Sequence, residues 1–268
     1  MRLFYQTLGM SRGSKSGHYG QILRQVVERS AAPGTTIDIF GLAPHRAVAD
    51  QYRYLEFQDT TEVLENGLRA EAEGYDAFLI GNFFQPGLHE LRELLNIPVL
   101  GLAESSVQMA CLMGPSFSLI NVNPKFNRRI TDGIKLQGLE SRLTSVEMMT
   151  VERPGVFDIA LQDEAVRTQI VSQFQKVARR ALDKGAEVLI PAGGSLMAAL
   201  LQAGLAQVDG APVLNGITAL VKTGEMAVQM RALTGTFTSK RLTYAPPAGK
   251  LLADVRAAYG EGVYPGAV

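Results

Sequence analysis

Short apolar segments alternate along the chain with longer stretches in which apolar residues recur every three or four positions. The short segments predict strands that are buried on both faces, because glycine, proline or polar residues bound each of them. The longer stretches predict amphipathic helices. In Asp163–Lys184, for example, Ile170, Phe174 and Val177 share one helical face. Strands and helices in alternation favour a parallel α/β fold.

The expected elements follow one another without a long irregular stretch until the C-terminal part. The predicted strands are Arg2–Gln6, Thr36–Phe40, Ala77–Ile80, Val99–Leu102, Ser118–Asn121, Thr144–Met149, Glu187–Pro191 and Val213–Leu214. The predicted helices are Tyr19–Glu28, Thr61–Glu73, Leu88–Leu95, Ser105–Met113, Phe126–Gln137, Asp163–Lys184, Leu196–Leu205 and Thr218–Leu233. After Leu233 we expect an extension with a last short helix at Leu251–Tyr259, packed on a lobe or a partner subunit; a disordered tail is the alternative.

Two segments of the chain resemble each other. Residues 72–85 read AEGYDAFLIGNFFQ and residues 183–195 read DKGAEVLIPAGGS. Each contains a helix end, a glycine, an acidic residue, a buried strand and a turn of small residues. Each is followed by a helix and a similar strand, in NIPVLG and GAPVLNG. This repeat predicts two similar parallel-sheet α/β lobes, with residues 1–99 and 216–268 in the first and residues 100–215 in the second.

The repeat also predicts where a ligand binds. In open α/β sheets, ligands bind outside the carboxyl ends of the strands. If the two lobes face each other, the turns at Gly81–Gln85 and Ala192–Ser195 lie on opposite walls of one cleft.

Composition excludes several classes of protein. The chain has 268 residues, and its 26 basic residues balance 26 acidic ones, which argues against a nucleic-acid or anionic-membrane partner. The single cysteine, Cys111, excludes an internal disulfide and a cysteine-rich zinc module, and three scattered histidines argue against a metal site. No apolar run reaches the roughly 18 residues of a membrane span, and the N-terminus lacks a signal-peptide pattern. We therefore expect a cytoplasmic protein.

Three motifs in a particular order carry a resemblance to a known family. They are IGNFFQPGLHELRELLNIPVLGLAES at 80–105, FSLINVNP at 117–124, and GAEVLIPAGGS at 185–195 followed by APVLNG. Together they resemble the Asp/Glu racemase superfamily, and most closely its hydantoin/allantoin racemase branch. The resemblance implies a cofactor-free enzyme with a small-molecule substrate between its lobes and assembly as a homo-oligomer.

The residues that define the chemistry of this superfamily are absent. Its members use two cysteines, one from each lobe, to remove and return a proton beside a carbonyl group. These cysteines align with Asn82 and, to within about one residue, with Ala192. Cys111 lies within a helical run and is expected to pack in the core.

The missing cysteines therefore point away from two-thiol racemisation and toward chemistry without thiols on a small carbonyl, carboxylate or cyclic-amide substrate. Lyase, isomerase and hydrolytic ring-opening reactions are all open at this point. Two alternatives remain beside them, a catalytically inactive protein that binds a small anion and a racemase that uses bases other than cysteine.

The two turns supply candidate groups that stabilise negative charge. Asn82 cannot act as a base, but its amide can donate a hydrogen bond to a carbonyl oxygen or an oxyanion. The second turn, which joins a strand to a helix, comprises Ala192, Gly193, Gly194 and Ser195. Its backbone N–H groups can bind an anion. We expect Asn82 and Ser195 to act in catalysis; a local turn contact and a helix N-cap are the alternatives.

Further candidates follow other predicted strands. Thr7 and Ser11 follow the first strand, Phe83 follows Asn82, and Asn121 ends the FSLIN strand; we expect all four to contact the substrate. The alternatives are an ordinary polar loop, a core position for Phe83 and a strand-end contact for Asn121.

Two residues are candidates for moving a proton. Glu104 follows the VLGLA segment, and His45 lies in the loop after the second strand. Histidine suits proton transfer near neutral pH. The alternatives are a glutamate that stabilises a helix dipole and a surface histidine. The segment GMSRGSKS at 9–16 lacks the spacing of a phosphate-binding loop, which argues against nucleotide hydrolysis.

Overall fold

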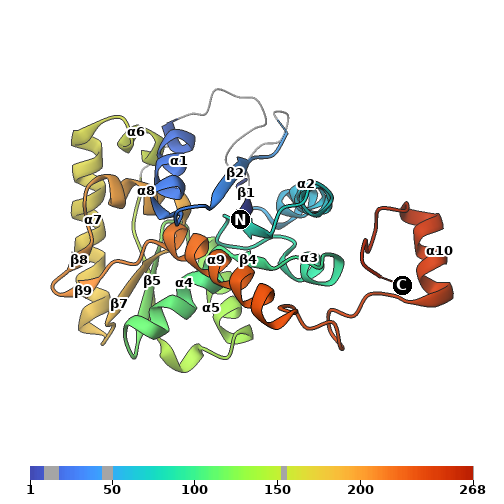
Figure 1. Cartoon of the computed structure of the whole chain (residues 1–268). Coiled ribbons are helices and arrows are strands. Elements are labelled where there is room, and N and C mark those ends of the chain that lie inside the picture. The colour runs from blue at the N-terminus through green and yellow to red at the C-terminus, as the bar shows by residue number, and fades with distance from the viewer. Residues whose placement is uncertain (9–17, 44–50, 152–155, 268) are drawn as a thin grey trace.

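The structure is a computed structural model that describes residues 1–8, 18–43, 51–151 and 156–267. Its two main sheets are both parallel and are flanked by helices (Figure 1). The strand order is β2-β1-β3-β4 in the first sheet and β6-β5-β7 in the second. The predicted two-lobed α/β architecture is thus confirmed.

The first sheet is built from the N-terminal part of the chain. Its strands are β1 (Arg2–Gln6), β2 (Thr36–Phe40), β3 (Ala77–Ile80) and β4 (Val99–Gly101), and the helices between them are α1 (His18–Ser30), α2 (Arg53–Ala72) and α3 (Leu88–Leu94). β1 and β3 lie in the middle and are almost entirely buried, because apolar residues occupy both of their faces. Their observed bounds match the predicted ranges.

The second sheet is formed by the middle of the chain. Its strands are β5 (Phe117–Asn121), β6 (Leu143–Met148) and β7 (Val188–Pro191). The surrounding elements are α4 (Leu102–Met113), α5 (Pro124–Leu136), η1 (Glu140–Arg142), α6 (Val156–Ala160), α7 (Glu164–Asp183), α8 (Gly194–Gln202), β8 (Gln207–Val208) and β9 (Ala211–Pro212). α7 begins where predicted, because the Asp163 carboxylate accepts hydrogen bonds from the first free N–H groups of the helix.

The chain then returns to the first sheet. α9 (Gly216–Thr234) starts at Asn215, whose side chain accepts a hydrogen bond from the N–H of Thr218. Gly224 allows α9 to approach Leu79 of β3, since a β-carbon at residue 224 would lie 2.7 Å from that leucine. The expected boundary at 99/100 falls inside β4, and the division of the chain into lobes at 99 and 215 stays a prediction.

One hydrophobic cluster joins the two sheets. It contains Leu3 and Leu79 from the first sheet, Leu119 and Ile190 from the second, and Leu220 from α9. The lobes therefore share a core, and their relative positions are fixed by packing.

Two predicted elements differ from the structure. Val213–Leu214 is not a strand of the sheet, since Val213 makes only an isolated bridge to Leu189. Instead β8 and β9 form a short hairpin, in which Asp209 and Gly210 have the positive φ values that a tight two-residue turn requires. α2 begins well before Thr61, because buried acidic residues on its inner face obscure the apolar period there.

The C-terminal extension packs on the first lobe. α10 (Gly249–Tyr259) stands away from the body of the molecule (Figure 1). The Lys240 ammonium donates hydrogen bonds of 2.7 Å to the carbonyl oxygens of both Arg92 and Glu93, at the end of α3. The Tyr264 hydroxyl donates to the Glu93 carboxylate over 2.7 Å. Within the described ranges, no helix has the length and apolar character needed to cross a membrane.

Candidate active site

A cavity of about 540 Å³ lies where the carboxyl ends of both sheets meet. The first lobe contributes Thr7, Leu8, Tyr19, Gln51, Gly81, Asn82, Phe83 and Phe84. The second contributes Val122, Asn123, Phe126, Val151, Phe157, Asp158, Ala192, Gly193, Gly194, Ser195 and Leu196. The two turns singled out by the internal repeat therefore line one cavity.

The first wall follows directly from the register of β1 and β3. Gln6 pairs with Ile80 in neighbouring parallel strands, so the residues that follow these strands emerge at the same edge. The N–H of Gly81 donates to the carbonyl of Gln6 over 2.7 Å and extends the ladder by one residue. The Asn82 side-chain oxygen accepts a 2.8 Å hydrogen bond from the N–H of Phe84, which fixes the turn. The amide NH₂ of Asn82 is a hydrogen-bond donor on the same turn.

The second wall is the turn between β7 and α8. Gly193 has a φ of 157°, a backbone conformation that favours glycine, and it precedes the first helical residue, Gly194. Its N-cap residue, Gly193, has no side chain, and the described residues make no side-chain cap hydrogen bond at this helix end. The first N–H groups of α8 therefore point beyond the helix without an internal partner, as in sites that bind anions.

Tyr19 links the two walls. Its side chain hydrogen-bonds with that of Thr7, and a β-carbon at residue 194 would lie 2.5 Å from its hydroxyl oxygen. Burial raises the pKa of Tyr19 to about 12; the hydrogen bond with Thr7 acts in the opposite direction, and the charge of Asp158 adds to the rise. Tyr19 is thus a neutral hydrogen-bond donor at neutral pH.

Asp158 and two amides complete the polar part of the cavity. Asp158 lies on α6 and is exposed, and it is the single carboxylate among the described lining residues. Asn123 donates a 3.1 Å hydrogen bond from its side chain to the side-chain oxygen of Gln51. This bond bridges the lobes at the cavity.

The apolar part of the cavity is an aromatic wall. The rings of Phe84 and Phe126 meet edge to face with centroids 4.6 Å apart. Arg129 places its guanidinium carbon 3.7 Å from the centroid of the Phe84 ring. Because these contacts come from both lobes, they hold the Phe84 ring in place in the wall of the cavity.

The structure brings together most of the expected site residues. Thr7, Asn82, Phe83, Ala192, Gly193, Gly194 and Ser195 all line the cavity. Ser11 and His45 lie outside the described residues.

Two expected site residues are held elsewhere. The buried Asn121 donates a 2.7 Å hydrogen bond to Asn127 and accepts one of 3.0 Å from the N–H of Asn123, so it supports a lining residue. Glu104 forms a 2.6 Å ion pair with Arg92 and does not line the cavity, and we assign it no role in proton transfer.

Cys111 also lies away from the cavity. It belongs to α4 and packs against the shared core. The described lining of the cavity therefore contains no thiol.

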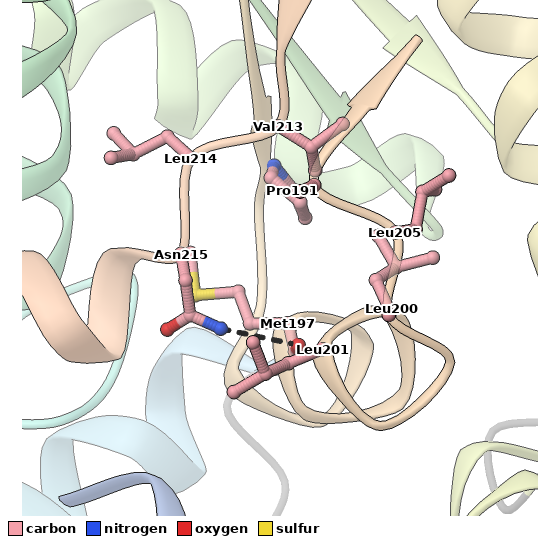
Figure 2. Close-up of a pocket in the computed structure, with 10 residues that line it drawn as sticks. Pro191, Met197, Leu200, Leu201, Leu205, Val213, Leu214 and Asn215 are labelled. Atoms are coloured by element: carbon pink, nitrogen blue, oxygen red, sulfur yellow. Dashed lines mark hydrogen bonds between the residues drawn. The ribbon is translucent and has the colours of Figure 1, made fainter. Parts of the chain in front are cut away.

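A second, smaller cavity of about 200 Å³ lies beside α8 (Figure 2). Leucine, valine and methionine side chains form most of its lining. Its polar side chain, Asn215, donates a 3.4 Å hydrogen bond to the carbonyl of Met197. With no ionisable group in this lining, we assign it no chemistry.

Sequence reasoning missed Tyr19 and Asp158. Tyr19 was predicted only as the start of a helix. Asp158 belongs to a helix that is too short to show a periodic pattern of apolar residues in the sequence. Gly194 was a usable signal that a large side chain, here that of Tyr19, packs against the start of this helix, because a glycine there leaves room for it.

Comparisons with known proteins identify the family of the chain. Residues 8–224 match the family described as Asp/Glu/Hydantoin racemase. The hydantoin racemase of Pseudomonas sp. (strain NS671) is 31% identical over 223 residues, which cover 83% of this chain and 84% of that protein.

Two solved structures share the fold. The allantoin racemase from Klebsiella pneumoniae has a TM-score of 0.73 at 24% identity and covers 92% of this chain and 94% of its own. The allantoin racemase from Pseudomonas fluorescens has a TM-score of 0.72 at 25% identity, with coverage of 93% and 98%.

Proposed function

Because the chain belongs to the Asp/Glu/Hydantoin racemase family, we propose that it is an isomerase that moves a proton beside a carbonyl group without a thiol. Its substrate is a small cyclic amide or carboxylate bound between the lobes. The observation that carries this proposal is that Asn82 and the turn at Gly193–Ser195 line one cavity whose described lining contains no cysteine.

Asp158 is the proposed proton acceptor. The carbon–hydrogen bond beside the carbonyl breaks, the proton passes to the Asp158 carboxylate, and the electron pair moves onto the carbonyl oxygen. The electron pair then returns from oxygen to carbon as a proton from solvent is delivered to the opposite face, which gives the mirror-image product. Asp158 releases its proton to solvent and is ready for the next cycle. Each step conserves atoms and charge and needs no oxidant.

The two turns stabilise the charge that develops on oxygen. Asn82 offers its amide NH₂, Ser195 its hydroxyl, and the start of α8 its backbone N–H groups. Donors held in place before the reaction are worth more here than in water, because they need no reorganisation when the charge appears.

Exchange of hydrogen for deuterium tests the reaction class directly. The protein is incubated in heavy water with single enantiomers of substituted hydantoins and with allantoin, and proton NMR and polarimetry follow each sample. We expect loss of the ring-carbon proton signal together with loss of optical rotation. Ring-opened or decarboxylated products would instead indicate hydrolytic or lyase chemistry, and saturable binding without either change would indicate a small-anion binding protein.

A cysteine-free variant provides the matched control. Cys111→Ser removes the single thiol of the chain at a position outside the cavity. We expect exchange at the wild-type rate. Loss of exchange in this variant, with the thermal midpoint unchanged, would contradict chemistry without thiols.

Assembly as a homo-oligomer and a cytoplasmic location stay predictions. Support for a second copy comes from Met226, Met230 and Leu233, which are exposed on α9 at spacings of four and three residues. This spacing is typical of a helix face that packs on another helix. Sedimentation velocity of wild-type protein and of Leu233→Gln tests it, since a monomer in both samples would contradict the prediction.

A further inference from the structure

The hydroxyl of Tyr5 lacks a hydrogen-bond partner among the residues that the structure describes. Tyr5 is the next-to-last residue of β1 and is fully buried. Buried hydroxyl groups in proteins are normally hydrogen-bonded, and an unpaired one is costly. A polar group that arrives with a ligand would supply the missing partner.

Gly81 places this hydroxyl against the wall of the cavity. A β-carbon at residue 81 would lie 2.5 Å from the Tyr5 hydroxyl oxygen, so the phenol can occupy this position only beside a glycine. Gly81 itself lines the cavity and precedes Asn82. The unpaired hydroxyl therefore lies directly behind the first turn.

Tyr19 stands in the same relationship to the second turn. A β-carbon at Gly194 would also lie 2.5 Å from a hydroxyl oxygen, that of Tyr19. Tyr5 and Tyr19 are close enough to interact electrostatically. The two phenols thus approach the cavity beside a glycine in each of the two turns.

Both phenols are hydrogen-bond donors at neutral pH. Burial raises the pKa of Tyr5 well above its ordinary value, and the electrostatic interaction with Tyr19 adds to this rise. A group with a raised pKa holds its proton, so it serves as a donor to oxygen and not as a base. The recognised atom is then an oxygen that carries or develops negative charge.

We propose that the hydroxyls of Tyr5 and Tyr19 bind one oxygen of the substrate between the turns at Gly81 and Gly194. The proposal rests on the proposed function and deepens it. The substrate class is a molecule with a carboxylate or enolisable amide oxygen that reaches past Asn82 to the phenols. Tyr19 contacts this oxygen at the cavity surface, and the Tyr5 hydroxyl gains its missing partner from behind Gly81 when the ligand is bound.

Three tyrosine variants test the proposal. Tyr5→Phe and Tyr19→Phe each remove one proposed donor. Tyr75→Phe is the control, because its hydroxyl donates a 2.7 Å hydrogen bond to Asp38 outside the cavity. We expect Tyr5→Phe to lower deuterium exchange at least about 10-fold and Tyr19→Phe about 100-fold, while the control keeps the wild-type rate.

Thermal midpoints separate ligand binding from a structural role. Removal of an unpaired buried hydroxyl removes a desolvation cost, so the ligand-free Tyr5→Phe protein should be as stable as wild type or more stable. A structural role would lower the midpoint and the exchange rate together. That outcome, or exchange at the wild-type rate in Tyr5→Phe, would overturn the proposal.

Binding can be followed without turnover. The chain contains eight tyrosines and no tryptophan, so a near-ultraviolet difference spectrum reports on phenols. We expect dimethylhydantoin, whose substituted ring carbon has no hydrogen to exchange, to give a spectrum in wild type that weakens in Tyr5→Phe. If wild type neither exchanges nor binds hydantoins, the proposed function fails. In that case malonate, a small dicarboxylate, tests whether the phenols bind an oxygen. A difference spectrum in wild type that weakens in Tyr5→Phe supports binding by the phenols, and the absence of a spectrum in wild type overturns it.

Discussion

Arg129 of α5 forms an ion pair with Glu56 of α2 and thereby connects a helix of the second lobe to a helix of the first. Both side chains are largely buried, with 14% and 10% of their surfaces exposed. The same guanidinium lies over the ring of Phe84 in the cavity wall. A single cation therefore fixes both the lobe contact and the position of an aromatic lining residue.

Removal of one partner of this pair should destabilise the protein strongly. In Glu56→Gln the largely buried guanidinium loses the negative charge of Glu56, for which a cost of up to about 3–5 kcal/mol is expected. Denaturant titration measures the free energy of unfolding. The control is Asp132→Asn, which breaks the neighbouring exposed pair with Arg128 and should cost less than about 1 kcal/mol. Equal costs in the two variants would show that the lobe contact is not specially stabilising.

Asn82→Asp separates the two roles of the Asn82 side chain. The aspartate keeps an oxygen acceptor for the N–H of Phe84, so the turn should remain folded. It loses the amide donor and brings a negative charge to the site. We expect deuterium exchange to fall about 100-fold or more with little change in thermal midpoint. Exchange at the wild-type rate would exclude Asn82 as a donor to the substrate.

Asp158→Asn tests the proposed base. The amide preserves size but cannot accept a proton, and a loss of about 100- to 10,000-fold in exchange is expected. Asp209→Asn is a control of the same chemistry at an exposed carboxylate that pairs with Arg179 outside the cavity. Both rates are measured by NMR in heavy water. Retained activity in Asp158→Asn would assign the proton transfer to another group.

Gly194→Ala should displace Tyr19. A β-carbon at residue 194 would lie 2.5 Å from the Tyr19 hydroxyl oxygen, so the ring must move and the contact with Thr7 is lost. We expect exchange to fall about 10-fold. Gly133→Ala is the matched control, since its β-carbon would meet nothing within 4 Å and should stabilise α5 by about 0.5–1 kcal/mol. Full activity in Gly194→Ala would argue against a role for the Tyr19 position.

Acid should weaken the second lobe through Glu147. Burial alone would raise the pKa of this carboxyl, but hydrogen bonds from Lys184 and Ser145 and the charges of Lys184 and Arg180 lower it below its ordinary value of 4.5. A depressed pKa stabilises the fold above the unfolded-state value, and this stability is lost as the pH falls through the folded-state value. We expect Glu147→Gln to be less stable than wild type at neutral pH, with the difference shrinking below pH 4.5. Denaturant titrations across this range provide the measurement, and a constant difference would contradict it.

The sequence was most informative where a local pattern controls the structure. Ala77–Ile80 is apolar on both faces and ends at a glycine, so its strand and turn were predictable, and the matching segment before Ser195 placed the opposite wall. The side chain of Glu104 could not be placed in this way. Its partner, Arg92, is 12 residues away on another helix, and only the packing of α3 on β4 brings the two together.

Tyr5 and Tyr19 show the same limit. From the sequence alone, Tyr5 is one apolar position of a predicted strand and Tyr19 is the first residue of a predicted helix. No feature of the neighbouring sequence indicates that both side chains approach glycines that follow strands. Their role depends on contacts between segments far apart in sequence, which secondary-structure patterns do not encode.

The return of α9 to β3 sets an order for folding during synthesis. The second sheet comes from one continuous stretch, so it can complete itself as the chain leaves the ribosome. The first sheet is translated earlier, yet the face of Leu79 is covered only when Gly224 and its helix, which follow the whole second sheet in sequence, emerge. The first sheet is therefore translated first but completed last. Until α9 forms, the face of Leu79 stays exposed on the nascent chain, where chaperones could bind it.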